Sequence, residues 1–143
     1  MKQMIWFDMD GTIANLYGVE GWLEDIKNER ADAYRNAKPM LNLQALARVL
    51  NRLEKAGYEI GIVSWLAKGA SANYDEKVRE AKKAWLAEHL ASVKFARVDI
   101  IKYGEPKQNG RDGILFDDEE PNRKAWNGQA YDVNEIIKVL RAM

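Results

Sequence analysis

The chain of 143 residues has no cysteine and a single histidine, His89. The absence of cysteine excludes disulfide bonds, thiolate nucleophiles and cysteine-ligated zinc. One histidine likewise excludes a metal site built from several imidazoles. His89 lies near the expected end of a helix, and we interpret it as a solvated residue favourably placed against the helix dipole, not as a catalytic group.

Net charge and long apolar segments are also absent. The 22 lysines and arginines balance 22 aspartates and glutamates, so no global basic field exists and we do not expect nucleic acid as a partner. No apolar run approaches the roughly 20 residues of a membrane span. The first residues reach acidic side chains too early for a signal peptide. We therefore expect a soluble cytoplasmic protein with no membrane partner, whose oligomeric state stays open.

The pattern of apolar residues predicts one α/β domain over residues 1–143. Short apolar runs at 4–7, 58–64, 93–101 and 114–116 predict strands, with a short fifth strand near Tyr131. Helical periodicity predicts helices at 41–56, 75–90 and 133–140. Strands that alternate with helices indicate a three-layer, mostly parallel sheet. Residues 15–38 are more polar and predict one or two short helices outside the main core.

Polar and charged side chains follow each of the four main strands. They are Asp8, Asp10 and Thr12 after the first, Ser64 after the second, Lys102 and Lys107 after the third, and Asp117 to Glu120 after the fourth. Loops at the carboxyl ends of parallel strands build the site in such sheets. Carboxylates packed together repel one another and raise one another's pKa. A hard divalent cation such as Mg²⁺, with oxygen ligands and a substrate phosphate, would relieve that repulsion.

The same residues carry a resemblance to a known family. Residues 7–13, FDMDGTI, resemble the first signature of the haloacid dehalogenase (HAD) superfamily of phosphohydrolases. Ser64, Lys107 and the pair Asp117-Asp118 resemble the second, third and fourth signatures, in the required order. The chain after residue 39, with GYEIGIVS and ILFDD, is similar to the 5'(3')-deoxyribonucleotidase branch. It departs from that branch in Trp65, where the family has proline, and in a much shorter insertion after the first signature; both departures concern substrate recognition.

The resemblance implies a role for each site residue. Asp8 would attack phosphorus to form an aspartyl-phosphate, and Asp10 would act as general acid and then general base. Ser64, with the backbone N–H groups of Met9 and Trp65, would bind phosphate oxygens. Lys107 would hold the phosphate and neutralise charge; Lys102 competes for this role, but the ten positions from 107 to 117 match the family spacing. The implied metal ligands are Asp8, Asp10 (through its backbone carbonyl), Asp117 and Asp118, the last directly or through water.

The resemblance thus implies a Rossmann-like core with residues 15–38 as a minimal helical cap. The implied activity is Mg²⁺-dependent hydrolysis of a small phosphomonoester, with (deoxy)nucleotides as the leading substrate class. Two alternatives stay open, a receiver-like phospho-signalling domain and a non-catalytic HAD-like binding module. A receiver carries its acid pair and its phosphoacceptor on separate strands, whereas Asp8 and Asp10 share one loop. A binding module has no need of Asp10.

The aromatic residues allow two interpretations each. Tyr17, Trp22 and Tyr34 in the insertion either stack on a ring of the substrate or pin the insertion to the domain, and we favour pinning. Trp65 either lines the pocket or packs against the core. Lys68 is a possible further phosphate contact but is more typical of a solvated surface.

Overall fold

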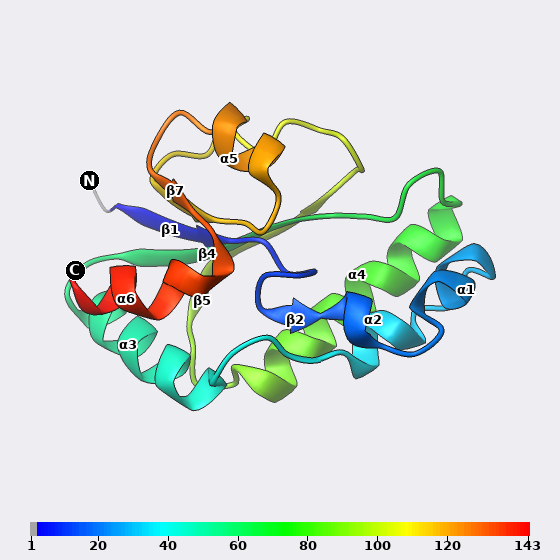
Figure 1. Cartoon of the computed structure of the whole chain (residues 1–143), viewed down its shortest axis with the longest axis horizontal. Coiled ribbons are helices and arrows are strands. Elements are labelled where there is room, and N and C mark those ends of the chain that lie inside the picture. Colours follow the sequence, from blue (N-terminus) through cyan, green and yellow to red (C-terminus); the bar gives the residue numbers. More distant parts are fainter. Residues whose placement is uncertain (1–2) are drawn as a thin grey trace.

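A computed structural model describes residues 3–143 of the chain. Five parallel strands form the central sheet in the order β5-β4-β1-β6-β7 (Figure 1). They span Met4–Phe7 (β1), Glu59–Trp65 (β4), Phe95–Ile101 (β5), Ile114–Phe116 (β6) and Ala130–Tyr131 (β7). The predicted α/β class, the parallel sheet and all five strands are therefore confirmed.

Helices pack on one face of the sheet, and a shorter layer covers the other. The first layer holds α3 (Leu43–Lys55), α4 (Ala72–His89), α6 (Ile136–Arg141) and the single turn η2 (Val133–Glu135). The second holds α5 (Glu120–Ala125) and the loops around it, with Trp126 packed on Trp6 and Leu115. Strand β1 buries Ile5 and Phe7 against the first layer and Trp6 against the second. Burial on both faces explains why β1 is a continuous apolar run.

The long helices begin and end at residues suited to those positions. The side chain of Asn42 accepts a hydrogen bond from the N–H of Ala45 at the start of α3, and Ser71 does the same for Tyr74 at the start of α4. Gly57, with φ of 109°, follows the end of α3. Trp85 is fully buried, as predicted, and its ring lies 4.5 Å from that of His89, which is therefore partly covered and not fully solvated.

Residues 15–38 form a compact segment fastened to α4. It contains η1 (Leu16–Gly18), α1 (Trp22–Lys27) and α2 (Asp32–Asn36), and its ends are joined by antiparallel pairing of β2 (Ala14–Asn15) with β3 (Lys38–Pro39). Tyr34 is buried in a cluster with Val78 of α4, and the hydroxyl of Tyr74 donates a hydrogen bond to the backbone carbonyl of Arg30. The segment is thus held against the domain, which is the arrangement favoured for Tyr34.

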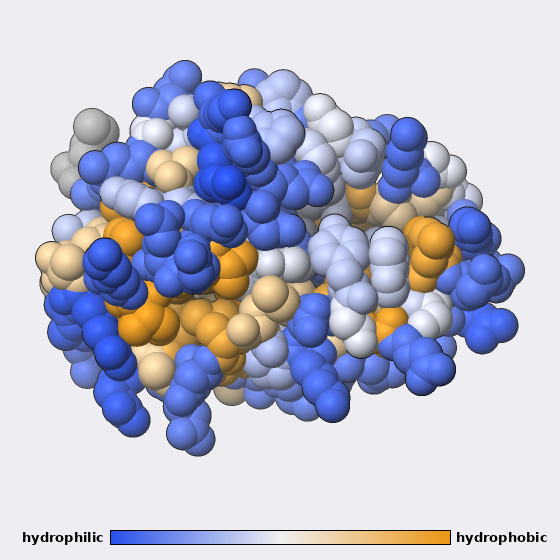
Figure 2. Space-filling view, viewed as in Figure 1, coloured by the Kyte–Doolittle hydropathy of each residue, from blue (hydrophilic) through white to orange (hydrophobic). Residues whose placement is uncertain are grey.

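Apolar surface gathers over α3 and α6, whereas hydrophilic residues dominate much of the rest of the visible face (Figure 2). A groove there is lined by the apolar Met40, Leu41, Val133 and Ile137 and by the polar Asp118, Asp132 and Asn134. None of the helices within residues 3–143 combines the length and the hydropathy needed to cross a bilayer.

Candidate active site

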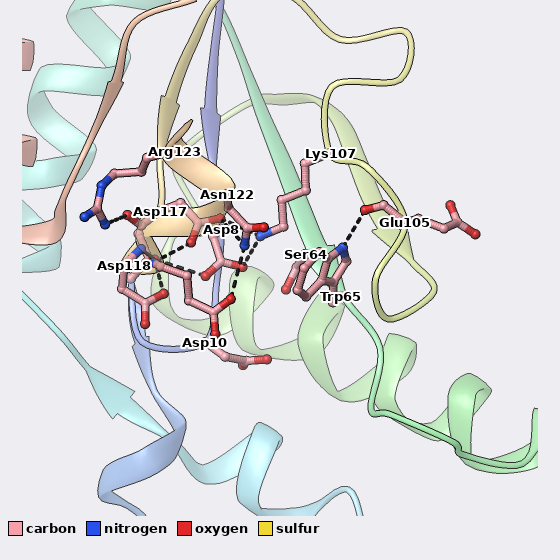
Figure 3. Close-up of polar contacts among 12 residues, drawn as sticks. Asp8, Asp10, Ser64, Trp65, Glu105, Lys107, Asp117, Asp118, Asn122 and Arg123 are labelled. Atoms are coloured by element: carbon pink, nitrogen blue, oxygen red, sulfur yellow. Dashed lines mark hydrogen bonds and ion pairs between the residues drawn. The ribbon is translucent and has the colours of Figure 1, made fainter. Parts of the chain in front are cut away.

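The site lies at the carboxyl edge of the sheet, where β1 is flanked by β4 and β6 (Figure 3). Asp8 follows β1, Ser64 lies near the end of β4, and Asp117 follows β6. All three are buried, with Asp8 6% and Asp117 0% exposed. The strand order brings together side chains that are more than 100 positions apart in the sequence.

Lys107 bridges the two buried aspartates. Its ammonium group donates hydrogen bonds to Oδ1 of Asp8 at 3.0 Å and to Oδ2 of Asp117 at 2.6 Å. Burial opposes the positive charge, but the two carboxylates outweigh that effect and raise the pKa of Lys107. Lys102, the competing candidate, is exposed, so Lys107 is the lysine that lies at Asp8.

Asp8, Asp117 and Asp118 form a compact cluster of oxygen ligands. One carboxylate oxygen from each lies within 4.8 Å of the others. Burial and the charge of Asp8 raise the pKa of Asp117 to about 6 and that of Asp118 to about 7. Three mutually repelling carboxylates of this kind suit a hard divalent cation, and the donor set fits Mg²⁺. The Asp10 carboxylate is held elsewhere, by Lys82.

The turn after Asp8 fits closely around Asp118. Gly11 has φ of 82°, and a side chain there would collide with the carboxylate of Asp118. Thr12 is fully buried; its hydroxyl accepts a hydrogen bond from the N–H of Asp118 and lies 3.1 Å from both Oδ2 of Asp8 and Oδ1 of Asp118. Thr12 therefore connects the loop after β1 with the loop after β6. We did not assign this role from the sequence, although Thr12 lies within the segment FDMDGTI.

Ser64 and Met9 lie beneath the site and do not line its pocket. Ser64 is fully buried, and its hydroxyl accepts a hydrogen bond from the ammonium group of Lys82 at 2.8 Å. The side chain of Met9 belongs to the core. The phosphate-binding roles predicted for Ser64 and for the N–H groups of Met9 and Trp65 stay predictions.

Trp65 contributes both to the pocket and to the loop that carries Lys107. Its Nε1 donates a hydrogen bond to the backbone carbonyl of Glu105 at 2.9 Å (Figure 3). Its ring lies 5.1 Å from the ring of Tyr103 and 5.1 Å from the ammonium group of Lys107. The same indole therefore lines the site and anchors residues 103–107.

Three further polar residues complete the site, and sequence reasoning missed them. Lys82 of α4 donates hydrogen bonds to Asp10 and Ser64. Asn122 and Arg123 of α5 donate hydrogen bonds to Oδ2 and to the backbone carbonyl of Asp117, at 3.2 and 2.9 Å. Lys82 had a detectable signal, because it falls on the apolar face marked by Val78 and Trp85. Helix α5 did not, because its segment is short and polar, and none of the helices that we predicted covers it.

A pocket of about 210 Å³ opens above Asp8, Asp10 and Lys107. Its floor is charged, whereas its walls are mostly aromatic and aliphatic. The walls comprise Leu16, Tyr17, Trp22, Leu23, Ile26, Tyr34, Trp65, Leu66, Ala67 and Tyr103, with Lys68 and Glu119 as the other charged contributors. This arrangement suits a small anion with an apolar or flat group attached, the anion at the charged floor and the attached group against the walls.

The fold, but not the sequence, is shared with a known protein. No protein-family model and no curated protein matches the chain. Among solved structures, D,D-heptose 1,7-bisphosphate phosphatase from Burkholderia thailandensis is similar, with a TM-score of 0.56 and 11% identity over 99% of this chain and 97% of that one. The chain therefore has the Rossmann-like α/β fold of this phosphatase along almost its whole length.

Proposed function

We propose that the chain is a Mg²⁺-dependent phosphomonoester hydrolase that works through an aspartyl-phosphate on Asp8. The observation that carries this proposal is the position of Asp8. Its carboxylate lies at the floor of a pocket, 3.0 Å from the ammonium group of Lys107 and beside the acidic pair Asp117 and Asp118. The shared fold with a phosphatase supports the same class of reaction.

The proposed reaction has two steps, and the residues present suit both. An oxygen of Asp8 forms a bond to phosphorus while the bond from phosphorus to the ester oxygen breaks, and Asp10 donates a proton to that oxygen. Water then attacks phosphorus and gives its proton to Asp10, and the bond to Asp8 breaks to release inorganic phosphate. Lys107 offsets the negative charge that builds up around Asp8.

Mg²⁺ would be held by the carboxylates of Asp8, Asp117 and Asp118 and by the backbone carbonyl of Asp10. When bound, it supplies positive charge between an anionic nucleophile and an anionic substrate. The compact carboxylate cluster supports this assignment, because its three members otherwise repel one another.

The substrate we propose is a small phosphomonoester that carries a planar ring, with (deoxy)nucleotides as the first class to test. Tyr17 and Trp22 pack edge to face at 5.0 Å along the pocket wall, and Trp65 and Tyr103 form another aromatic pair. Aromatic walls of this kind stack on planar rings. We propose that residues 15–38 act as a small fixed cap that contributes this wall.

A substrate screen tests the proposal. Purified protein would be assayed for phosphate release from mononucleotides, deoxynucleotides, sugar phosphates and phosphorylated oligonucleotide ends, with Mg²⁺ and with EDTA. We expect hydrolysis of at least one nucleotide only when Mg²⁺ is present, and no turnover by Asp8→Asn. Phosphorylation of Asp8 by a small phosphodonor without turnover of any ester would instead support a receiver-like domain. Binding without either reaction would support a non-catalytic module.

A further inference from the structure

Lys82 is a buried cation that the reaction described above does not use. It lies on α4, its side chain is 1% exposed, and its ammonium group faces the end of β4 and the loop after β1. An unpaired charge at such a depth would be strongly unfavourable. The contacts that Lys82 makes must therefore account for its presence.

The ammonium group of Lys82 has three donors, and all three are occupied. They go to Oδ2 of Asp10 at 2.9 Å, to Oγ of Ser64 at 2.8 Å and to the backbone carbonyl of Trp65 at 2.8 Å. A lysine ammonium has no fourth proton to offer. Lys82 is thus saturated by the protein and has no donor left for a substrate phosphate, unlike Lys107, which faces the pocket.

These contacts fix one side of the Asp10 carboxylate. Oδ2 is held by Lys82, and within residues 3–143 no hydrogen bond engages Oδ1, although Asp10 lines the pocket. The ring of Tyr34, 5.1 Å from the ammonium group, covers Lys82 from the side of the insertion. One carboxylate oxygen is therefore anchored while the other is left for a molecule in the pocket.

We propose that Lys82 is a positioning residue that holds the Asp10 carboxyl group where it can deliver its proton to the leaving oxygen. This inference rests on the proposed function. Proton delivery accompanies cleavage of the bond between phosphorus and the ester oxygen, and the proton passes from Asp10 to that oxygen. A carboxyl group displaced by 1 Å or so would no longer meet that oxygen, and such misplacement lowers rates by orders of magnitude.

The dependence of the rate on the leaving group separates this role from a merely structural one. An alkyl phosphate such as glycerol 2-phosphate releases a strongly basic oxygen that needs the proton. 4-Nitrophenyl phosphate releases a weakly basic phenolate that leaves without one. General acid assistance raises the rate by about 10²–10⁴-fold where it is needed. A misplaced Asp10 therefore lowers the rate of hydrolysis more for the alkyl ester than for 4-nitrophenyl phosphate.

The test compares kcat for both esters in wild type, Lys82→Met and Asp10→Asn, with thermal unfolding measured for each protein. Lys83→Met is the matched control, because Lys83 is the exposed neighbour of Lys82 on the same helix. We expect Lys82→Met to lose at least about ten-fold more activity on the alkyl ester than on 4-nitrophenyl phosphate. Asp10→Asn should show the same selectivity, and the double variant should lose little more than Asp10→Asn alone.

Lys82→Arg keeps the test decisive if Lys82→Met fails to fold, since it retains the buried positive charge. Its planar guanidinium group cannot reproduce the three contacts of an ammonium group, so the same selective loss is expected. Equal losses on the two esters would overturn the positioning role while leaving the proposed function standing. A wild type that hydrolyses neither these esters nor any member of the substrate screen would overturn both.

Discussion

The ammonium group of Lys107 lies 2.6 Å from the carboxylate of Asp117, and both side chains are almost completely buried. The same ammonium group contacts Asp8 at 3.0 Å. One cation thus balances two carboxylates at the point where the reaction is proposed to occur.

Replacing Lys107 should affect both stability and activity. Lys107→Met leaves Asp8 and Asp117 buried without their cation, and breaking such a pair is expected to lower the free energy of unfolding by about 3–5 kcal/mol. Phosphatase activity should fall by at least about 10²-fold, because charge on the phosphate is no longer offset. Urea unfolding and steady-state kinetics measure the two effects.

Lys102→Met is the matched control for Lys107→Met, since Lys102 is an exposed lysine of the same loop region. It should change the free energy of unfolding by less than about 0.5 kcal/mol, as for most surface substitutions. If Lys102→Met abolished activity and Lys107→Met did not, the assignment of the lysine would be wrong.

The stability of the metal-free protein should depend on pH in an unusual direction. Burial and the charge of Asp8 raise the pKa of Asp117 from its usual 3.8 to about 6, and that of Asp118 to about 7. At pH values between the usual pKa and the raised pKa, each of these two carboxyl groups is more protonated in the folded chain than in the unfolded chain. The contribution of these two groups to the free energy of unfolding therefore falls as the pH rises from about 4 to about 7.

Mg²⁺ should reverse that trend, because it binds the ionised carboxylates. The gain in Tm on replacing EDTA by Mg²⁺ is expected to grow as the pH rises from about 5 to about 8, which is roughly the range set by the raised pKa values. Thermal unfolding followed by circular dichroism measures this gain. In Asp118→Asn the gain should shrink. A gain that is constant with pH in wild type would argue against metal binding by this cluster.

The turn at Gly11 should not tolerate alanine. Gly11→Ala combines a positive φ with a collision against Asp118. Gly69→Ala is the control, because Gly69 also has a positive φ, of 66°, but has open space where a Cβ would lie. We expect Gly69→Ala to lower the free energy of unfolding by about 1 kcal/mol from backbone strain alone, and Gly11→Ala to lower it further and to remove most activity. Equal effects would mean that contact with Asp118 is unimportant.

The aromatic wall should determine how tightly a ring-bearing substrate binds. Trp22→Leu removes the edge-to-face partner of Tyr17 from the pocket wall. Loss of an aromatic contact worth about 0.5–1.5 kcal/mol raises KM for a nucleotide by roughly 2- to 12-fold. KM for an alkyl phosphate that lacks a ring should change little. A proportional rise for both substrates would indicate that Trp22 supports the pocket without contacting the ring.

The sequence alone determined the fold class, the order of the main strands along the chain and the residues at the centre of the site. Continuous apolar runs that stop at charged residues, such as 4–7 before Asp8 and 114–116 before Asp117, mark buried parallel strands and the edge of the sheet where the candidate site lies, because both signals are local. Recognition of the DxDGT motif and the spacing of Lys107 from Asp117 depended likewise on neighbouring positions only. Such local patterns can be read from the sequence without knowing how distant segments of the chain pack.

Only the tertiary structure decided which polar groups pair within the site. Lys82 and Asp10 are 72 positions apart, and α4 must pack beneath the ends of β1 and β4 before their contact exists. The burial of Ser64 beneath the pocket, the tie from Thr12 to Asp118 and the support of Asp117 by α5 depend in the same way on strand order and helix placement. Pairing between distant side chains is set by packing, and no local period or spacing records it.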